Sequence, residues 1–374
     1  MKIIYNMKRI SFICAMLVFA ATASAQHYYV DSENPEMLRH ADFRDPARKE
    51  VILPCQVNGY NVYKADLHAH TVYSDGSVTP QFRVEEAWRD GLDILAITEH
   101  IEYRPFEGTM KEYLGGSKDK DPDLNASVNI ALKEAEKWDI FIIPGTEITR
   151  NGTTVGHFNA LFTKDNNKIY DEDPVQAIRN AKSQGALVQH NHPGWIRTSL
   201  DYTETEKTAY DEGLIDGVEV MNFYEFYPGI IDRVRERGLF IAANTDVHAG
   251  TAEDFNSHEY MRPMTLVLAT ERTEQGIREA LGSCRTLAFG FNTICGDEQL
   301  LKDFFAASMR VKKLSKDSYM LTNLTSVPYI IRIEGRNQMY ISPFTTIKVN
   351  GPGKFAVLNM FCGKDTNPVV ELSF

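Results

Sequence analysis

Short apolar runs alternate with amphipathic stretches along most of the chain, and this alternation predicts the fold. The run 92–98 is almost continuously apolar, as expected for a strand buried on both faces of a sheet. The predicted strands are 62–67, 92–98, 140–146, 155–162, 186–190, 217–221, 239–244, 265–269 and 286–289. The predicted helices are 79–91, 174–184, 228–238 and 274–281, with one more that ends at 137. At least seven strand–helix repeats in about 230 residues predict a closed α/β barrel with parallel strands.

The pattern changes near residue 298. A helix at about 297–308 ends the alternation, and from Met309 onward short strands are separated by turn signals such as Asn350-Gly351. We therefore expect a barrel domain over 26–298 and a small antiparallel, sandwich-like β domain over 299–374. The β domain contains no histidine, so we expect the chemistry in the barrel.

The first 25 residues have the features of a secretory signal peptide. Lys8 and Arg9 precede an apolar run, 10–21, and Ala23-Ser24-Ala25 provides a small-residue cleavage site before Gln26. The run is too short to span a bilayer. The sequence predicts a secreted or periplasmic protein with no membrane span after cleavage, although an uncleaved anchor is the alternative.

Composition narrows the possible partners. The formal net charge of -11 argues against a nucleic acid polymer or an anionic membrane as the main partner. Four of the five cysteines follow the signal peptide, in a compartment where disulfides can persist. Cys284 with Cys295 is the first candidate disulfide, and free thiols are the alternative.

Polar side chains gather where the predicted strands end. His68 and His70 are spaced i, i+2, which places both imidazoles on one face of a strand, and the Ser74-Asp75-Gly76 turn adds a carboxylate. A polar surface strand would give the same local pattern, but later strand ends supply matching groups. Six histidines and three carboxylates are expected at one barrel mouth, which is about right for two or three divalent ions.

These segments resemble the ordered motifs of the PHP (polymerase and histidinol phosphatase) family over about residues 64–250. The matching segments are DLHAHTVYSDG, AITEH, PGTEI, GHFNAL, HNHPGW and NTDVH. The resemblance implies a distorted (β/α)7 barrel that holds two or three divalent metal ions (Mn, Fe or Zn) and hydrolyses phosphoesters. The implied metal ligands are His68, His70, Asp75, His100, Glu147, His157, His192, Asp246 and His248.

One motif departs from the family pattern. The second motif usually reads TDH, whereas this chain has Thr98-Glu99-His100 with the longer acid, so the contact from this acid to His100 is left open. The signal peptide and the trailing β domain resemble the secreted, Sb-PDE-type phosphodiesterases of the family.

The expected mechanism uses a metal-bridging hydroxide that attacks phosphorus in line, since divalent ions lower the pKa of water from about 15.7 to about 7. Glu147 and Asp75 are the candidate bridging carboxylates. His190 could be a ligand, a proton donor or a packed group behind the ligands, and His258 is a candidate general acid. Arg197 could clamp the phosphate. The candidate pocket walls are Trp195 and the run 223–227.

The sequence favours a secreted, metal-dependent phosphodiesterase that acts on a small anionic phosphoester. A phosphomonoesterase of the same family is one alternative. An amidohydrolase-type barrel is another, although Glu147 stands where that class often carries a carboxylated lysine. The third alternative is an inactive metal-binding or glycan-binding module.

Overall fold

The computed structural model describes residue 36 and residues 47–106, 123–255 and 260–372. The predicted signal peptide and most of the predicted loop at 104–123 lie outside these residues. The chain divides at Arg48 into two units, Met1–Arg48 and Lys49–Phe374. In the described part of the chain, no helix combines the length and the apolar character needed to cross a membrane.

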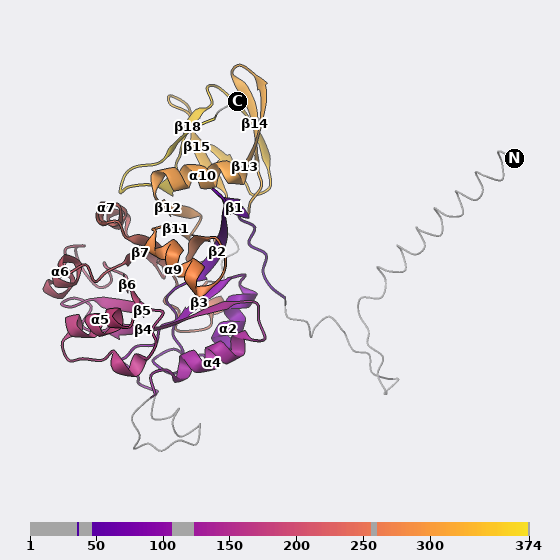
Figure 1. Cartoon of the computed structure of the whole chain (residues 1–374). Coiled ribbons are helices and arrows are strands. Elements are labelled where there is room, and N and C mark those ends of the chain that lie inside the picture. The colour runs from indigo at the N-terminus through magenta and orange to yellow at the C-terminus, as the bar shows by residue number, and fades with distance from the viewer. Residues whose placement is uncertain (1–35, 37–46, 107–122, 256–259, 373–374) are drawn as a thin grey trace. The chain divides into compact units, whose positions relative to one another are not determined.

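Seven strands follow one another around a curled sheet, which confirms the distorted seven-stranded barrel, and Figure 1 labels six of them, β2 to β7. Each strand is hydrogen-bonded to the next one in the ring, and an isolated bridge between Ala69 and Val247 joins the segments that follow the first and last strands. The strands are, in ring order, β2 (Tyr60–Asp66), β3 (Ile94–Ile97), β4 (Phe141–Thr149), β5 (His157–Leu161), β6 (Leu187–His190), β7 (Gly217–Asn222) and β9 (Phe240–Asn244).

The expectation that all barrel strands run parallel is wrong at β5. This strand is antiparallel to both β4 and β6, whereas the other neighbours in the ring are parallel. Only residues 150–156 connect β4 to β5, and a crossover between parallel strands needs a dozen residues or more. The reversal brings the first residue of β5, His157, to the end of the barrel where its neighbours finish.

Helices follow most of the strands, as the sequence predicted. At α2 (Pro80–Arg89) the Thr79 side chain accepts a hydrogen bond from the backbone N–H of Phe82, with Pro80 in the first turn. The sequence analysis missed α6 (Glu204–Asp211), which begins with a capping box formed by Thr203 and Glu206. The other helices are α4 (Ala126–Ala135), η1 (Asn166–Lys168), α5 (Pro174–Ser183), α7 (Pro228–Arg237), α8 (Thr251–Asp254), α9 (Glu274–Gly282) and α10 (Glu298–Ser308).

The sheet continues beyond the ring on one side of β2. There β10 (Met264–Ala269) and β11 (Thr286–Gly290) were predicted as barrel strands, but both run antiparallel to their neighbours. The remaining members of this sheet are β1 (Gln56–Val57), β8 (Glu225–Phe226), β12 (Thr293–Gly296) and β19 (Met360–Phe361).

The C-terminal strands form two small antiparallel sheets, as predicted. Their apolar side chains pack with α10, where the Phe305 ring lies 5.1 Å from Tyr329 and 5.7 Å from Phe355. The first sheet contains β13 (Met309–Ser315), β14 (Ser318–Asn323) and β17 (Thr346–Asn350). The second contains β16 (Met339–Ile341), which was not predicted, with β15 (Tyr329–Arg332), β18 (Lys354–Val357) and β20 (Val369–Glu371).

The four described cysteines are free thiols, so the suggested Cys284–Cys295 disulfide is not formed. Cys295 is fully buried, and this burial raises the pKa of its thiol. It lies in β12, while Cys284 follows α9.

Candidate metal centre

The backbone on each side of the barrel closure brings two motifs together. His68 and His70 follow β2, while Asp246 and His248 follow β9. The Asp246 N–H donates to the His68 carbonyl at 2.9 Å, and the His70 N–H donates to the Val247 carbonyl at 3.1 Å. Asp246 has a φ of +53°, a left-handed conformation that aspartate adopts more readily than most residues. These bonds fix the four side chains around one space.

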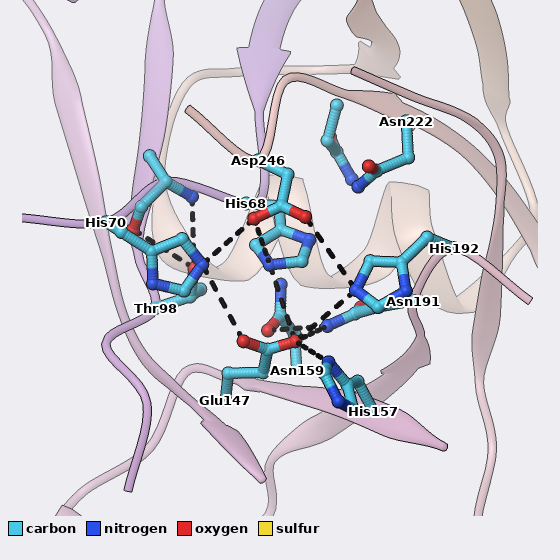
Figure 2. A network of polar contacts seen from close by, with 12 residues as sticks. His68, His70, Thr98, Glu147, His157, Asn159, Asn191, His192, Asn222 and Asp246 are labelled. Atoms are coloured by element: carbon cyan, nitrogen blue, oxygen red, sulfur yellow. Dashed lines mark hydrogen bonds and ion pairs between the residues drawn. The ribbon is translucent and has the colours of Figure 1, made fainter. Parts of the chain in front are cut away.

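Glu147 lies at the centre of this space and is fully buried, and Figure 2 shows its carboxylate among His68, His70, His157 and His192. Charges on His100 and His68 hold the pKa of Glu147 well below its usual range, although burial alone would raise it. The group is therefore an anion. Its oxygens lie 3.6 Å from His68 Nε2, 3.6 Å from His70 Nε2, 2.5 Å from His100 Nδ1, 3.2 Å from His157 Nδ1 and 3.7 Å from His192 Nε2.

Two aspartates complete the arrangement. Asp246 Oδ1 lies 3.2 Å from His68 Nε2 and 3.1 Å from His70 Nε2. Asp75 Oδ1 lies 3.3 Å from His100 Nε2 and 3.1 Å from His248 Nε2. All nine residues implied as ligands therefore meet at one place.

Potential ligand atoms within this place fall into four overlapping groups. In each group, every atom lies within 4.8 Å of the others. The groups are His70, Asp75, His100 and His248; His68, His70 and Glu147; His68, His192 and Asp246; and Glu147, His157 and His192. Overlap of this kind provides shared ligands for more than one divalent ion.

Several buried atoms of the cluster face one another in ion-pair contacts, but they have no partner in hydrogen-bond geometry among the described residues. They are His68 Nε2, His70 Nε2, Asp75 Oδ1, Glu147 Oε2 and His157 Nδ1. An unsatisfied buried polar atom costs about 1–3 kcal/mol. Five such atoms facing one space fit a site for divalent cations, and imidazole and carboxylate ligands suit Mn, Fe or Zn.

Hydrogen bonds behind the cluster orient the histidine rings. His157 Nε2 lies 2.8 Å from the Arg150 carbonyl and His248 Nδ1 lies 2.8 Å from the Asp246 carbonyl. A carbonyl only accepts hydrogen bonds, so each of these nitrogens carries the proton. The opposite nitrogen then presents its lone pair to the centre, as a metal ligand requires.

Glu219 is a residue that the sequence analysis missed. It is fully buried in β7, where Oε1 accepts from His68 Nδ1 at 2.9 Å and Oε2 accepts from the His192 backbone N–H at 2.8 Å. Asn222 and Asn244 also donate to it. A carboxylate in the middle of the apolar run Gly217–Asn222 was the available sequence signal, because an acid is rarely buried without partners.

The carboxylate of Glu99, the longer acid of the second motif, does not hydrogen-bond to His100. Its carboxylate instead accepts from the Thr71 backbone N–H at 3.1 Å and from the side chains of Thr71 and Ser74. Glu99 therefore stabilises the turn that contains Asp75.

Two predicted catalytic residues do not reach the centre. The ring nitrogens of His190 lie 3.0 Å from the Tyr210 hydroxyl and 2.9 Å from Glu206, and burial lowers the pKa of this histidine. Arg197 makes a two-pronged ion pair with Glu206 at 3.0 and 2.7 Å. Both side chains bind Glu206 of α6, and neither of them lines the cavity beside the cluster. His258 lies outside the described residues.

A pH-dependent contribution to stability follows from Glu206. Burial would raise the pKa of Glu206, but hydrogen bonds from His190 and Arg197 lower it to about 2, from an ordinary value of 4.5. This carboxylate therefore stabilises the fold above pH 4.5, and the contribution is lost as the pH falls towards 2. We expect the difference in unfolding free energy between wild type and Glu206→Gln to shrink over that range.

Urea unfolding of chelator-treated protein at several pH values measures this difference. Glu204→Gln, an exposed change on the same helix, is the matched control and should give no such trend. A wild-type advantage over Glu206→Gln that is constant with pH would contradict the assignment.

The cluster opens into a cavity of about 770 Å³. Trp195 lines it, as predicted, and so does Phe223 from the aromatic run. The remaining lining residues are Asp75, His100, Glu102, Tyr103, Thr149, Arg150, Gly152, His157, His192, Ile196, Asn222, Glu225, Asp246, His248, Ala249 and Asp254.

Comparisons with known proteins agree with this arrangement. A two-domain protein from Bacteroides vulgatus, which contains a predicted PHP-like metal-dependent phosphoesterase, has 33% sequence identity and a TM-score of 0.79. The match covers 88% of this chain and all of that one. An uncharacterised protein of Methanocaldococcus jannaschii is 24% identical over 213 residues, which are 54% of this chain and 88% of that protein.

Shorter matches exist to larger proteins. The error-prone DNA polymerase of Mycobacterium tuberculosis is 38% identical over 80 residues, 21% of this chain. The matched part spans only 7% of the polymerase. The family model of the PHP domain matches residues 66–308, which is more than half of the chain. This protein therefore belongs to the PHP domain family.

Proposed function

We propose that this protein is a metal-dependent phosphoester hydrolase and that phosphodiesters are its preferred substrates. The observation that carries the proposal is the cluster of nine histidine, aspartate and glutamate residues at the mouth of a large cavity, in which five buried ligand atoms make no hydrogen bond. Phosphoryl transfer depends on positioning and charge neutralisation, which such a cluster can provide.

Each part of the cluster has a distinct task in this proposal. Two or three divalent ions (Mn, Fe or Zn), when bound, would supply the Lewis acidity that activates water and neutralises phosphate oxygens. His68, His70, His100, His157, His192 and His248 would hold the ions as neutral ligands, with Asp75, Glu147 and Asp246 as anions. Before metal binds, charges on neighbouring histidines hold the pKa of the Glu147 and Asp246 carboxyls well below its usual range, and bound cations would replace those charges.

The charges around the cavity support a diester over a monoester. Arg150 is the one lysine or arginine among the described lining residues, and its guanidinium pairs with Glu102 at 2.7 Å. No spare cation is therefore available in this lining for the second charge of a monoester dianion. A diester carries a single charge, which the ions would neutralise.

Paired chromogenic substrates test the proposal. We expect protein reconstituted with Mn, Fe or Zn to cleave bis(p-nitrophenyl) phosphate with a higher kcat/KM than p-nitrophenyl phosphate. A chelator should abolish both activities, and the metal should restore them. Cleavage of the monoester alone would overturn the diester preference, and inactivity on both would overturn the phosphoesterase.

The proposal also includes the location of the protein and the size of its substrate. Residues 1–25 would direct the chain to secretion or the periplasm, as in the Sb-PDE-type branch, and be removed near Gln26. The substrate would be a small anionic phosphoester and not a nucleic acid polymer, consistent with the net charge of -11. N-terminal sequencing of protein from the extracellular or periplasmic fraction tests the predicted location and cleavage. A chain that begins at Gln26 is expected, and an intact Met1 would contradict cleavage.

A further inference from the structure

We propose that one ester group of the phosphodiester substrate is an aromatic or apolar ring that binds on Trp195 and Ile196. We also propose that the substrate has no negative charge beyond its phosphodiester. Both statements rest on the proposed function and refine it. The two residues together are called the apolar wall below.

The apolar wall exposes large side chains at the entrance to the cluster. Trp195 is 41% exposed and Ile196 is 60% exposed, and both line the cavity. The Trp195 ring centroid lies 5.5 Å from that of His157 and 5.3 Å from that of His192. A phosphoryl group bound at ions that these histidines hold would therefore place an ester substituent beside the indole.

The indole of Trp195 is held in position from behind. A Cβ added to Gly152 would lie 2.9 Å from the ring, so the ring packs directly on the glycine backbone. The next segment is fixed to the same place, because Arg197 Nε donates to the Gly152 carbonyl at 2.6 Å. The Arg197–Glu206 ion pair anchors the other end of that guanidinium.

Ile196 occupies a strained backbone conformation. Its φ is +53°, where a β-branched residue is an outlier, and most of its side chain is exposed to solvent. Strain persists only where the surrounding structure imposes it, as the Arg197 anchors do here, and it concentrates at ligand sites. The exposed part of this apolar side chain is not buried by folding, and it presents a surface to a ligand.

The charged groups of the cavity lining oppose any additional negative charge on the substrate. The Arg150 guanidinium is committed to Glu102 and to the Asp171 carbonyl. Outside the metal cluster, the other charged groups of the described lining are the carboxylates of Glu225 and Asp254. A neutral ring can lie between these groups and the apolar wall, whereas a second anion would be repelled.

Three substrates with one leaving group test the inference. They are methyl, phenyl and 4-carboxyphenyl 4-nitrophenyl phosphate. Stacking on an aromatic ring contributes enough for about a tenfold effect. We expect wild type to prefer the phenyl ester over the methyl ester by about tenfold in kcat/KM, and over the carboxyphenyl ester by a similar factor.

In Trp195→Ala the phenyl-to-methyl ratio should fall by about tenfold, with metal content unchanged. Tyr340→Ala, which removes an aromatic ring 57% exposed in the β domain, is the matched control and should keep the wild-type ratio. Equal use of the methyl and phenyl esters, or an unchanged ratio in Trp195→Ala, would overturn the role of the apolar wall. Equal use of the carboxyphenyl ester would overturn the charge restriction. Failure of metal-loaded wild type to cleave any of the three would instead overturn the proposed function.

Discussion

Replacing Glu147 with glutamine is expected to reduce phosphodiester hydrolysis on the order of 10³-fold or more. Removing a single electrostatic contact to a transition state costs about 10²–10³-fold, and this change also removes the charge shared by the overlapping ligand groups. The shape of the side chain is nearly preserved, so the loss reports the charge. Steady-state kinetics and elemental analysis of the purified variant provide the measurement.

Glu172→Gln is the matched control for Glu147→Gln, because Glu172 is exposed and lies outside the cavity lining. It should retain wild-type metal content and turnover. A Glu147→Gln protein with full metal content and turnover within a few-fold of wild type would show that this carboxylate is not a metal ligand.

Replacing Glu219 with glutamine is expected to weaken metal binding or turnover by about 10–100-fold, as usual for groups that orient metal ligands. Glu219 accepts hydrogen bonds from His68, from the His192 backbone and from two asparagine side chains. A glutamine amide would turn an NH₂ group towards some of these donors, so the His68 ring would lose its fixed orientation.

Competition with a chromogenic chelator measures the affinity of the Glu219→Gln variant for each metal. A circular dichroism spectrum and unfolding curve of the metal-free protein separate a loss of orientation from a loss of fold. Wild-type affinity and turnover in a folded variant would contradict the orienting role of Glu219.

The sequence predicted the centre well because its signals are local. The i, i+2 spacings of His68 with His70 and of Asp246 with His248 place each pair on one side of a strand end, and parallel strands bring these ends together. The seven residues between β4 and β5 also contained the signal for an antiparallel connection. This signal was overlooked because the apolar runs alone do not give strand direction.

The positions of His190 and Arg197 could not be predicted in the same way. Both depend on Glu206, which comes from a helix whose capping box was overlooked, and charge pairing in a folded core is not a local property. The left-handed φ values of His192 and Ile196 are also imposed by tertiary contacts. The residues that shape the cavity were therefore harder to identify than the residues that form the cluster.

The most direct test of the account is metal content, measured by elemental analysis together with bis(p-nitrophenyl) phosphate hydrolysis, in wild type and in His68→Ala. His68 is buried with Nε2 facing both Glu147 and Asp246. The account predicts two or three divalent ions per wild-type chain with diester cleavage, and loss of both in the variant. A metal-free wild type that cleaves the diester, or a metal-loaded one inert on phosphoesters, would contradict it.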